Sequence, residues 1–587
     1  MHWHSLLHIL GTSVNRCGIS TCAGMVLEAI LVIVGAAAAW MFPNVGANGF
    51  RKVEQWFSRI ARRRRLAVLA VGALALAARA AVLPIEPIPQ PAVHDEFSYL
   101  LAADTFAHWR LTNPPHPMWV HFESFQILQK PTCMSKYYPA QGVVLAAGQV
   151  IFGHPFWGVW LSVGLMCGAL CWMLQGWMPP GWALLGGLLS VFRLAIFNYW
   201  GNSYWGGAVA ALGGALVLGA LPRLRRNPRA RNTLLLGLGL AILANSRPYE
   251  GFLLGLAVGI VMSLWLLGRR GPSWGVMARR VVAPLLLVLV PTVCAMGYYF
   301  WRVTGSPFRI PYLVYAATYD PVPNFPWRPL PVFPEYHHQV MKDFDLAAPL
   351  EIYKLVRAHP VEIACHRALA FAAFFLGTVL LMPVGALLFA RRWKFFRGLI
   401  RPGKVRPLLF LCAFPLAGIA LVVPYFPHYA APLTGALYAL VMLAMRHLRL
   451  WQWRNRPVGR QLVRAVPVLA VVLLVLDVSI LGVQNGFFAP GRDFGRSAVL
   501  AQLKQYAHGQ LVIVQYGEDH VAFNEWVYND AEIDAAKVVW ARDMGVSANA
   551  ELIRYFKGRR VWLLEPDETP PKLLPYSPEG GNAAPSP

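Results

Sequence analysis

The segment RRRRLAVLAVGALALAARAAVLPIEPIPQPAVHDEFSYLL (residues 62–101) contains the order of features that decides the fold. Four arginines precede an apolar run, a proline-rich exit follows it, and an Asp-Glu pair comes soon after the exit. A helix of about 20 apolar residues crosses the hydrocarbon core of a bilayer, and arginines concentrate on the cytoplasmic side of such helices. The segment therefore predicts a membrane span that leads outward to acidic residues on the far side.

The composition of the whole chain agrees with a membrane protein. The chain has 587 residues, of which 57% are hydrophobic and only 14% are charged, and its formal net charge is +25. Soluble domains contain about 25% charged residues, and a nucleic-acid-binding protein shows basic stripes on a charged chain. The composition excludes a disordered or fibrous protein and most soluble enzymes. We predict a mostly α, polytopic membrane helical bundle.

Apolar runs recur along the chain, and the segments between them alternate in charge. Five connections hold 29 Lys and Arg with a single acid, whereas the segments opposite hold 19 Lys and Arg with 24 Asp and Glu. The positive-inside rule assigns the five basic connections to the cytoplasm. This topology requires the apolar stretch 140–153 to be a re-entrant or interfacial helix. The basic connections are 43–65, 222–231, 268–280, 391–406 and 446–464. The twelve predicted spans are 26–42, 66–83, 157–177, 182–199, 204–221, 232–246, 250–268, 281–300, 363–389, 407–424, 429–445 and 465–484.

The chain divides into four predicted parts. Within the outer loop 84–156, leucines and aromatics at helical spacing predict a helix on the membrane surface after the Asp-Glu pair. The tail alternates strand and helix patterns, which predicts a small, accessory α/β domain with a partly parallel sheet on the outer side. No signal peptide is predicted before Met25, and Met25 is as natural a start as Met1. The parts are 1–65 (span and basic loop), 66–484 (membrane module with outer loops 84–156 and 301–362), 485–575 (α/β domain) and 576–587 (disordered end).

Asp95 and Glu96 are the first candidates for chemistry, because they follow a span on the non-cytoplasmic side. A partly desolvated carboxylate can accept a proton from a hydroxyl group or bind a divalent cation. The structural alternative is that the pair caps a helix, whose positive N-terminal end favours acids.

The Asp-Glu pair and three later motifs resemble the GT-C superfamily of membrane glycosyltransferases. This superfamily includes protein O-mannosyltransferases, aminoarabinose transferases and lipopolysaccharide galacturonosyltransferases. The resemblance covers about 66–445 in layout, and its later motifs are KYYPAQGVVLAAGQVIFG (136–153), ANSRPYEG (244–251) and FPHYAAPL (426–433). It implies the GT-C fold and transfer of a sugar, with inversion, from a polyprenyl-phosphate carrier at the outer face of a bacterial inner membrane. It also implies that Asp95, with Glu96 beside it, is the catalytic group. His94 departs from the family pattern and leaves open a role for a divalent metal.

Arg247 is the main candidate for binding the phosphate of the carrier. A guanidinium is always protonated and can bind phosphate through two hydrogen bonds, and charges near a membrane core are costly and by default functional. The alternative is a structural pair with Glu250 or an arginine that reaches the interface.

The remaining candidates are polar and aromatic residues near the outer face. His428, Tyr429 and Lys136 are predicted to contact the donor phosphate or sugar, although aromatic residues also belong to the membrane-interface belt. Tyr138 is a candidate for stacking on sugar. The pair His337 and His338 suits a metal site or a substrate contact, with solvated loop histidines as the alternative.

The sequence favours an integral membrane glycosyltransferase and keeps three alternatives. A transporter or flippase of a lipid-linked solute would place paired charges deep in several spans, and only Asp477 is clearly mid-span. A non-catalytic envelope scaffold or sensor would use the tail as its ligand domain, and an oligosaccharide polymerase or ligase would share the carrier. The expected partners are a polyprenyl-phosphate-linked sugar, a lipid, glycan or protein acceptor, and membrane lipids, without nucleic acid.

Overall fold

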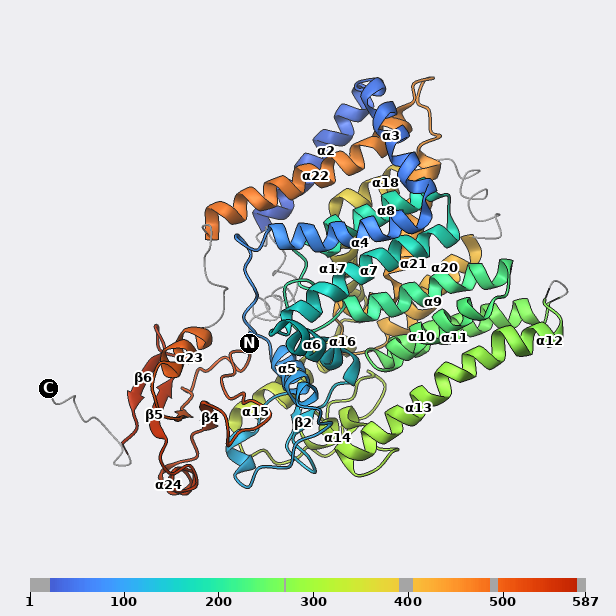
Figure 1. The fold of residues 1–587 in the computed structure, drawn as a ribbon. Coiled ribbons are helices and arrows are strands. Elements are labelled where there is room, and N and C mark those ends of the chain that lie inside the picture. The colour runs from blue at the N-terminus through green and yellow to red at the C-terminus, as the bar shows by residue number, and fades with distance from the viewer. Residues whose placement is uncertain (1–21, 269–270, 390–404, 486–494, 578–587) are drawn as a thin grey trace.

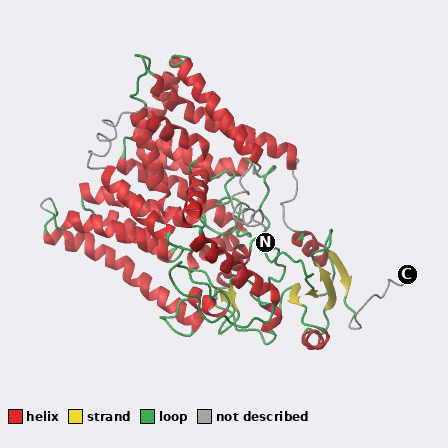
Figure 2. Ribbon diagram, turned by 180° about the vertical axis from the view of Figure 1, so that it is seen from behind, coloured by secondary structure: helices red, strands yellow, loops and turns green. Residues whose placement is uncertain are grey.

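The computed structural model describes residues 22–268, 271–389, 405–485 and 495–577. The first 21 residues and most of the predicted disordered end at 576–587 lie outside this part of the chain. A large helical bundle makes up most of the molecule, and a small sheet with two helices forms its C-terminal unit (Figures 1 and 2). The predicted class, a mostly α membrane bundle with a small α/β unit, is confirmed.

The bundle consists of apolar helices. By length and composition, six described helices are able to cross a membrane, or seven if one sharply bent pair counts as a single span, and five further apolar helices are shorter. The chain is therefore a multi-pass membrane protein, while the number of twelve spans stays a prediction. The bundle helices are α2 (Cys22–Met41), α4 (Arg64–Ala81), α7 (Phe156–Trp177), α8 (Pro180–Leu194), α9 (Ala208–Arg226), α10 (Ala230–Ala244), α11 (Pro248–Leu266), α13 (Ala283–Thr304), α17 (Pro360–Phe375), α18 (Gly377–Phe389), α20 (Val405–Ala420), α21 (Thr434–Leu448) and α22 (Val458–Asn485).

The two ends of the bundle carry different connections. The basic connections with α3 (Ala47–Arg62) and α12 (Trp274–Met277) lie at its right-hand end in Figure 1, and the long loops and the C-terminal unit lie at the lower left. This arrangement agrees with the alternation of charge along the sequence. The loop elements are α5 (His94–Ala107), η1 (Trp119–Phe122), β1 (Ile127–Leu128), β2 (Met134–Ser135), α6 (Pro139–Phe152), α14 (Pro311–Thr318), α15 (Gln339–Lys342), η3 (Asp343–Ala347) and α16 (Ala348–Ala358), and η2 (Ala278–Val282) joins α12 to α13.

Helix α5 is present where the sequence predicts a helix, and most of its residues are buried by other parts of the protein. Its position at the membrane surface stays a prediction. The helix packs against α6 and β2, and the ring of Phe97 on α5 stacks on Tyr528 of the tail at 4.0 Å. Its apolar and small residues therefore face protein on several sides, which the short sequence pattern did not indicate. The stretch 140–153, predicted as a re-entrant or interfacial helix, is the 14-residue α6.

A close contact between α9 and the short helix η4 (Pro427–Leu433) positions one side of the candidate site. A Cβ added at Gly214 of α9 would lie 1.9 Å from the carbonyl oxygen of Pro432. Small residues allow such backbone approach between membrane helices. The contact fixes η4, which carries His428 and Tyr429, against the bundle.

Helices α17 and α18 meet at a bend of 109°, the geometry of a broken span or of a re-entrant loop. Gly377 follows the break with a φ of +57°, a conformation that glycine adopts without the steric cost of a Cβ. Arg193 of α8 donates from its Nε to the Phe374 carbonyl at 3.1 Å and from Nη2 to the Ala373 carbonyl. These bonds satisfy carbonyls that the end of α17 leaves without helical partners.

The C-terminal unit is a four-stranded sheet with two helices, and its partly parallel topology confirms the prediction. The strand order is β4-β3-β5-β6, with β3 parallel to β4 and β5, and β6 antiparallel to β5. Strand β6 was not predicted. The elements are α23 (Arg496–Lys504), β3 (Gln510–Val514), β4 (Val538–Arg542), α24 (Val546–Tyr555), β5 (Arg560–Glu565) and β6 (Lys572–Pro575).

This unit is docked on the first outer loop through buried polar contacts. Arg542 donates to Glu525 at 2.7 Å within the unit and to the carbonyl of Glu123 in the loop at 2.8 Å. The Ala531 amide donates to Asp104 of α5 at 2.9 Å. Removing one partner of a buried arginine–carboxylate pair strongly destabilises the folded protein, because the other charge is left buried and unpaired. The tail, expected to be accessory, is therefore part of the structure that holds α5.

Candidate functional site

Asp95 lies in the first turn of α5 and is held by a tyrosine. The hydroxyl of Tyr137 donates to Asp95 Oδ1, and the Tyr137 ring stacks on Tyr99 at 4.6 Å. Tyr99 is four residues after Asp95, so both side chains lie on the same face of the helix. Burial, and then the negative charge of Asp95, raise the pKa of Tyr137 well above its usual value. The phenol stays protonated and orients the carboxylate.

Glu96 is fully buried and bound to the main chain. Its Oε2 accepts from the amides of Ala92 and Val93 at 3.0 Å each, and its Oε1 accepts from the amide of Tyr204 at 3.0 Å. Such a carboxylate caps the start of α5 and ties it to the segment before α9. The adjacent acids thus have different environments, and the chemical role stays a prediction for Asp95 rather than Glu96.

Arg247 lies between α10 and α11 and is half-buried. Its guanidinium carbon is 4.7 Å from the centre of the Tyr429 ring, and no carboxylate of the described residues lies within 4.0 Å of it. Arg247 follows the C-terminal end of α10 (Ala230–Ala244), and the negative end of that helix dipole disfavours phosphate. The structure also places Arg247 at the N-cap of α11, and the positive end of this longer helix favours an anion.

The predicted residues at 95, 247 and 429 lie in one cluster. Asp95 and Arg247 both act electrostatically on the hydroxyls of Tyr429 and Tyr99. Burial is the main cause that raises the pKa of Tyr99, and the positive charge of Arg247 opposes this effect. The structure therefore brings together a carboxylate from the first outer loop, a guanidinium from the middle of the chain and a phenol from a late turn.

His428 is part of the same region. It is buried, and its ring meets the edges or faces of Tyr199, Trp205 and Tyr429 at 5.0–5.7 Å. Neither ring nitrogen has a hydrogen-bond partner among the residues that the structure describes. The charge of Arg247 acts on the imidazole. A buried imidazole with free nitrogens is suited to a polar group of a ligand.

Glu250 and Tyr138 lie beside Arg247. Glu250 is buried in the first turn of α11, and it acts electrostatically on Arg247 without an ion pair within 4.0 Å in the described chain. Tyr138 is the N-cap of α6, and burial followed by the charge of Glu250 raises its pKa to about 12. Both residues lie near Arg247, and neither forms an ion pair with it that would neutralise its positive charge.

Lys136 provides a second cation, held by aromatic rings. Its ammonium lies 4.4 Å from the centre of the Tyr315 ring and 4.7 Å from that of Tyr312. Arg247 and Asp95 also act on the hydroxyl of Tyr312, so this tyrosine links the two cations to the cluster. Cation–π contacts position a positive charge without neutralising it in an ion pair.

Asp320 and Asp345 face this lysine, and the sequence analysis missed both. Burial raises the pKa of each, and the charge of Lys136 opposes the rise. Asp345 also accepts a hydrogen bond from Tyr315 at 3.0 Å. Their positions in an irregular loop offered no periodic signal, since only the fold of 301–362 over the first loop brings them to Lys136.

His94 is buried among aromatic rings from three parts of the chain. Its ring centre lies 4.2 Å from that of Phe344 in the second outer loop and 5.5 Å from those of Phe125 and Phe523. Burial lowers its pKa to about 4, although Asp95 and Glu525 oppose the shift. The imidazole is neutral at pH 7. Phe523 was missed, because nothing in the sequence links the tail to residue 94.

His337 and His338 lie in a different polar network. His337 Nδ1 is 2.9 Å from Glu123 Oε2, and His338 Nε2 is 2.8 Å from the Val120 carbonyl. Within the described chain, no group of three or more His, Cys, Asp or Glu side chains is arranged to hold a metal ion. The two histidines join the loops, and the structure does not bring them to Asp95 or Arg247.

Comparison with known proteins gives matches among solved structures only. No protein-family profile and no curated sequence matches the chain. ArnT from Cupriavidus metallidurans, bound to undecaprenyl phosphate, matches with 14% identity and a TM-score of 0.48 over 85% of this chain and 93% of its own. The oligosaccharyltransferase of Archaeoglobus fulgidus, tethered to an acceptor peptide, matches with 11% identity and a TM-score of 0.46 over 87% and 70%. Both are of the superfamily that the sequence motifs resemble, but at these values the likeness says nothing about the reaction of this chain.

Proposed function

We propose that this chain is an integral membrane glycosyltransferase that moves a sugar from a polyprenyl-phosphate-linked donor to an acceptor hydroxyl on the extracytoplasmic face. The observation that carries the proposal is the cluster of Asp95, Arg247 and Tyr429 at the end of the bundle opposite the basic connections. It combines a base for the acceptor with a cation for a phosphate leaving group.

Asp95 acts as the general base. The hydroxyl of Tyr137 occupies one carboxylate oxygen, which leaves the other oxygen able to accept the proton of the acceptor hydroxyl. The acceptor oxygen attacks C1 of the sugar on the face opposite the carrier, so the configuration at C1 inverts. As this bond forms, the bond between C1 and the phosphate oxygen breaks, and its electron pair stays on the phosphate. General bases contribute about 10²–10⁴-fold to such rates.

Arg247 stabilises the charge that develops on the leaving phosphate. Fixed cations lower a barrier most where charge appears in the transition state. Arg247 is held over Tyr429 and at the start of α11, and Lys136 supplies a second, ring-held cation nearby. His428 donates a hydrogen bond to the phosphate or the sugar.

An assay of the purified full-length protein with a panel of polyprenyl-phosphate sugars tests the proposal. Asp95→Asn should lower transfer at least about 100-fold, with an unchanged melting temperature in detergent. Asp343→Asn, which changes an exposed acid of the second outer loop, is the matched control and should transfer normally. Full transfer by Asp95→Asn would contradict the assignment of the base.

A second candidate, a transporter, is favoured by one observation. Glu28, Arg193 and Asp477 from three different helices line one cavity of about 100 Å³ beside the break between α17 and α18. Paired charges inside the bundle are typical of transport pathways. The cavity is smaller than the roughly 300 Å³ of ordinary ligand pockets, and Arg193 is bound to helix carbonyls. If the chain is a transferase, Asp477→Asn should keep transfer activity within about twofold, whereas a transporter should lose uptake or flipping of its solute.

A further inference from the structure

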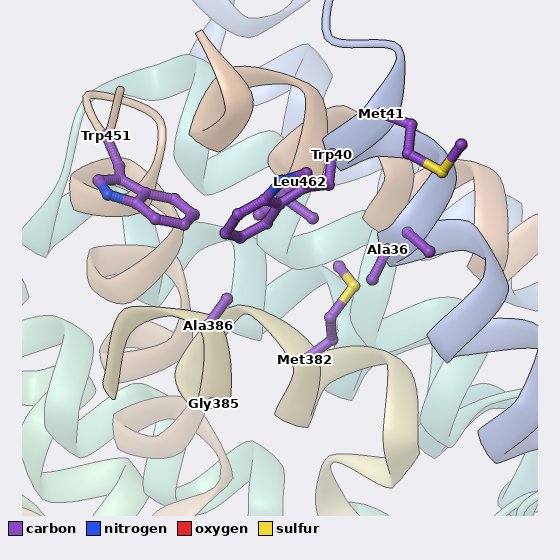
Figure 3. A pocket seen from close by; sticks show the side chains of 9 residues that line it. Ala36, Trp40, Met41, Met382, Gly385, Ala386, Trp451 and Leu462 are labelled. Atoms are coloured by element: carbon purple, nitrogen blue, oxygen red, sulfur yellow. The ribbon is translucent and has the colours of Figure 1, made fainter. Parts of the chain in front are cut away.

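A cavity of about 480 Å³ is lined mainly by α2, α18 and α22. These helices lie in the upper part of the bundle in Figure 1, away from α5, which carries Asp95. The lining of the cavity comes from α2, α18, α22 and the turn before α22, as Figure 3 shows. All nine lining side chains are apolar or aromatic: Ala36, Ala37, Trp40, Met41, Met382, Gly385, Ala386, Trp451 and Leu462. Apart from the indole N–H groups of Trp40 and Trp451, such a lining offers no polar side chain to a solute and suits a hydrocarbon chain.

Three tryptophans mark one end of this cavity. The ring of Trp40 lies 5.3 Å from that of Trp451 and 5.2 Å from that of Trp453. Trp40 ends the first span, and α2 ends one residue later at Met41. Tryptophan rings gather at the level of lipid headgroups. The tryptophans therefore indicate that this end lies near the membrane–water interface on the basic side.

A tight turn that begins at Trp453 also contains two arginines, Arg454 and Arg456. Trp453 and Arg456 exchange two backbone hydrogen bonds of 2.9 and 3.0 Å, and the two residues between them have positive φ, +48° at Arg454 and +60° at Asn455. Glycine or asparagine is the usual residue at such positions, and a side chain as long as arginine costs conformational energy there. We take the arginine at this strained position as a sign that its positive charge takes part in an interaction.

The charges at this end are not all neutralised. Arg449 and Arg464 both contact Glu54, at 3.2 and 3.0 Å. Arg454 and Arg456 are exposed, and neither forms an ion pair with another residue in the described part of the chain. The turn whose Trp453 ring packs against Trp40, a lining residue of the apolar cavity, thus carries positive charge without an ion pair, which complements an amphipathic anion.

We propose that this cavity binds one acyl chain of an anionic glycerophospholipid from the leaflet on the basic side, with its phosphate at Arg454 and Arg456. Basic pockets between membrane helices on the cytoplasmic side bind acidic headgroups, and each arginine near such a headgroup adds about fivefold in affinity. The site is separate from the proposed transfer reaction and does not depend on it.

Native mass spectrometry of the purified full-length protein, titrated with phosphatidylglycerol and phosphatidylcholine of equal chain length, tests the headgroup. The wild type should retain phosphatidylglycerol in preference to phosphatidylcholine. The double change Arg454→Gln and Arg456→Gln should weaken binding of phosphatidylglycerol by up to about 25-fold and abolish the preference. Arg225→Gln, an exposed arginine of another basic connection, should leave the preference unchanged. Equal binding of the two lipids by the wild type, or an unchanged preference in the double variant, would overturn the proposal.

A cavity-filling substitution tests the acyl chain. A Cβ added at Gly385, which lines the cavity, meets no atom within 4 Å, so Gly385→Leu extends into open space and also suits a helix better than glycine. Binding of both lipids should fall at least fivefold. Gly259→Leu in α11 is the matched control, because a Cβ there also meets nothing within 4 Å and Gly259 does not line the cavity. If Gly385→Leu binds the lipids as well as the Gly259→Leu control does, the acyl chain does not occupy this cavity and the proposal is contradicted.

Discussion

Arg247 and Arg193 are both arginines at the ends of short apolar helices, but their surroundings differ. Arg193 donates to the carbonyls of Ala373 and Phe374 at the bend between α17 and α18. Arg247 lies over an aromatic ring, at the positive end of α11, with no carboxylate within 4.0 Å among the described residues. The guanidinium of Arg193 makes hydrogen bonds to main-chain carbonyls of the fold. The guanidinium of Arg247 is positioned by an aromatic ring and can still bind an anion. The difference separates a structural charge from one that is available to a ligand.

Asp95 and Glu96 repeat this contrast on neighbouring residues. Both oxygens of Glu96 accept from main-chain amides, whereas one oxygen of Asp95 is oriented by a phenol. A group with all its hydrogen bonds made by the fold contributes to stability, and a group with spare capacity can take part in chemistry. Variants of these four residues test the contrast.

Arg247→Gln should have the largest effect. Loss of a preorganised charge at a developing anion costs about 10²–10³-fold in rate, and because the fold makes little use of this guanidinium, the melting temperature should change little. Arg247→Lys should recover part of the activity, since it restores the charge without the two-pronged geometry. The measurement is the transfer rate at saturating acceptor. If the melting temperature of Arg247→Gln falls strongly while the folded protein transfers sugar normally, Arg247 has a structural role like that of Arg193.

Arg193→Gln should show the opposite pattern. It leaves carbonyls at the break with fewer partners and removes the cation near Glu28 and Asp477, which should lower stability by about 3 kcal/mol. The transfer rate per folded molecule should stay within about threefold of the wild type. Thermal unfolding in detergent followed by size-exclusion chromatography measures the first quantity. If the variant unfolds normally but transfers poorly, the distinction between the two arginines fails.

His94 should make the outer loops sensitive to acid. Its pKa is about 4 in the folded protein against about 6.5 when exposed, so the unfolded chain binds the proton more readily. Stability is therefore complete above pH 6.5 and falls as the pH drops from 6.5 towards 4, by about 2–3 kcal/mol at pH 4.5. His94→Phe, which fits the surrounding aromatic rings, should reduce the drop in melting temperature between pH 7.5 and 4.5. An equal drop in this variant would show that other groups cause it.

Glu96→Gln should give the smallest change. An amide retains one acceptor oxygen but turns an N–H group towards amide donors, which should cost about 1–2 kcal/mol of stability. Because Asp95 is untouched, the transfer rate at a temperature below unfolding should be within about threefold of the wild type. A loss as large as that of Asp95→Asn would show that the two carboxylates act together.

The membrane class, the alternation of basic and acidic connections, and the tail's strands and helices were predictable because each follows from local pattern. Hydrophobic length and charge act over about 20 residues, and α6, β3, β4 and β5 appear near their predicted positions. The burial of α5 was not predicted, because part of what covers it, such as Tyr528 of the tail, lies far along the chain. Phe523 and Asp320 were missed for the same reason, because each lies far along the sequence from the residue that it approaches, His94 and Lys136 respectively.

The sequence by itself determined which residues are charged, which runs are apolar and which connections are basic or acidic, since these properties depend on composition and short-range order. Only the tertiary structure decided how each charge is used. Asp95 meets Tyr137, Arg193 meets carbonyls at the bend between α17 and α18, and the ring of Trp453, next to Arg454 in the chain, packs against Trp40 of an apolar cavity. The reason is physical: the cost of a buried or half-buried charge depends on its partners, and the folded chain brings those partners from distant positions.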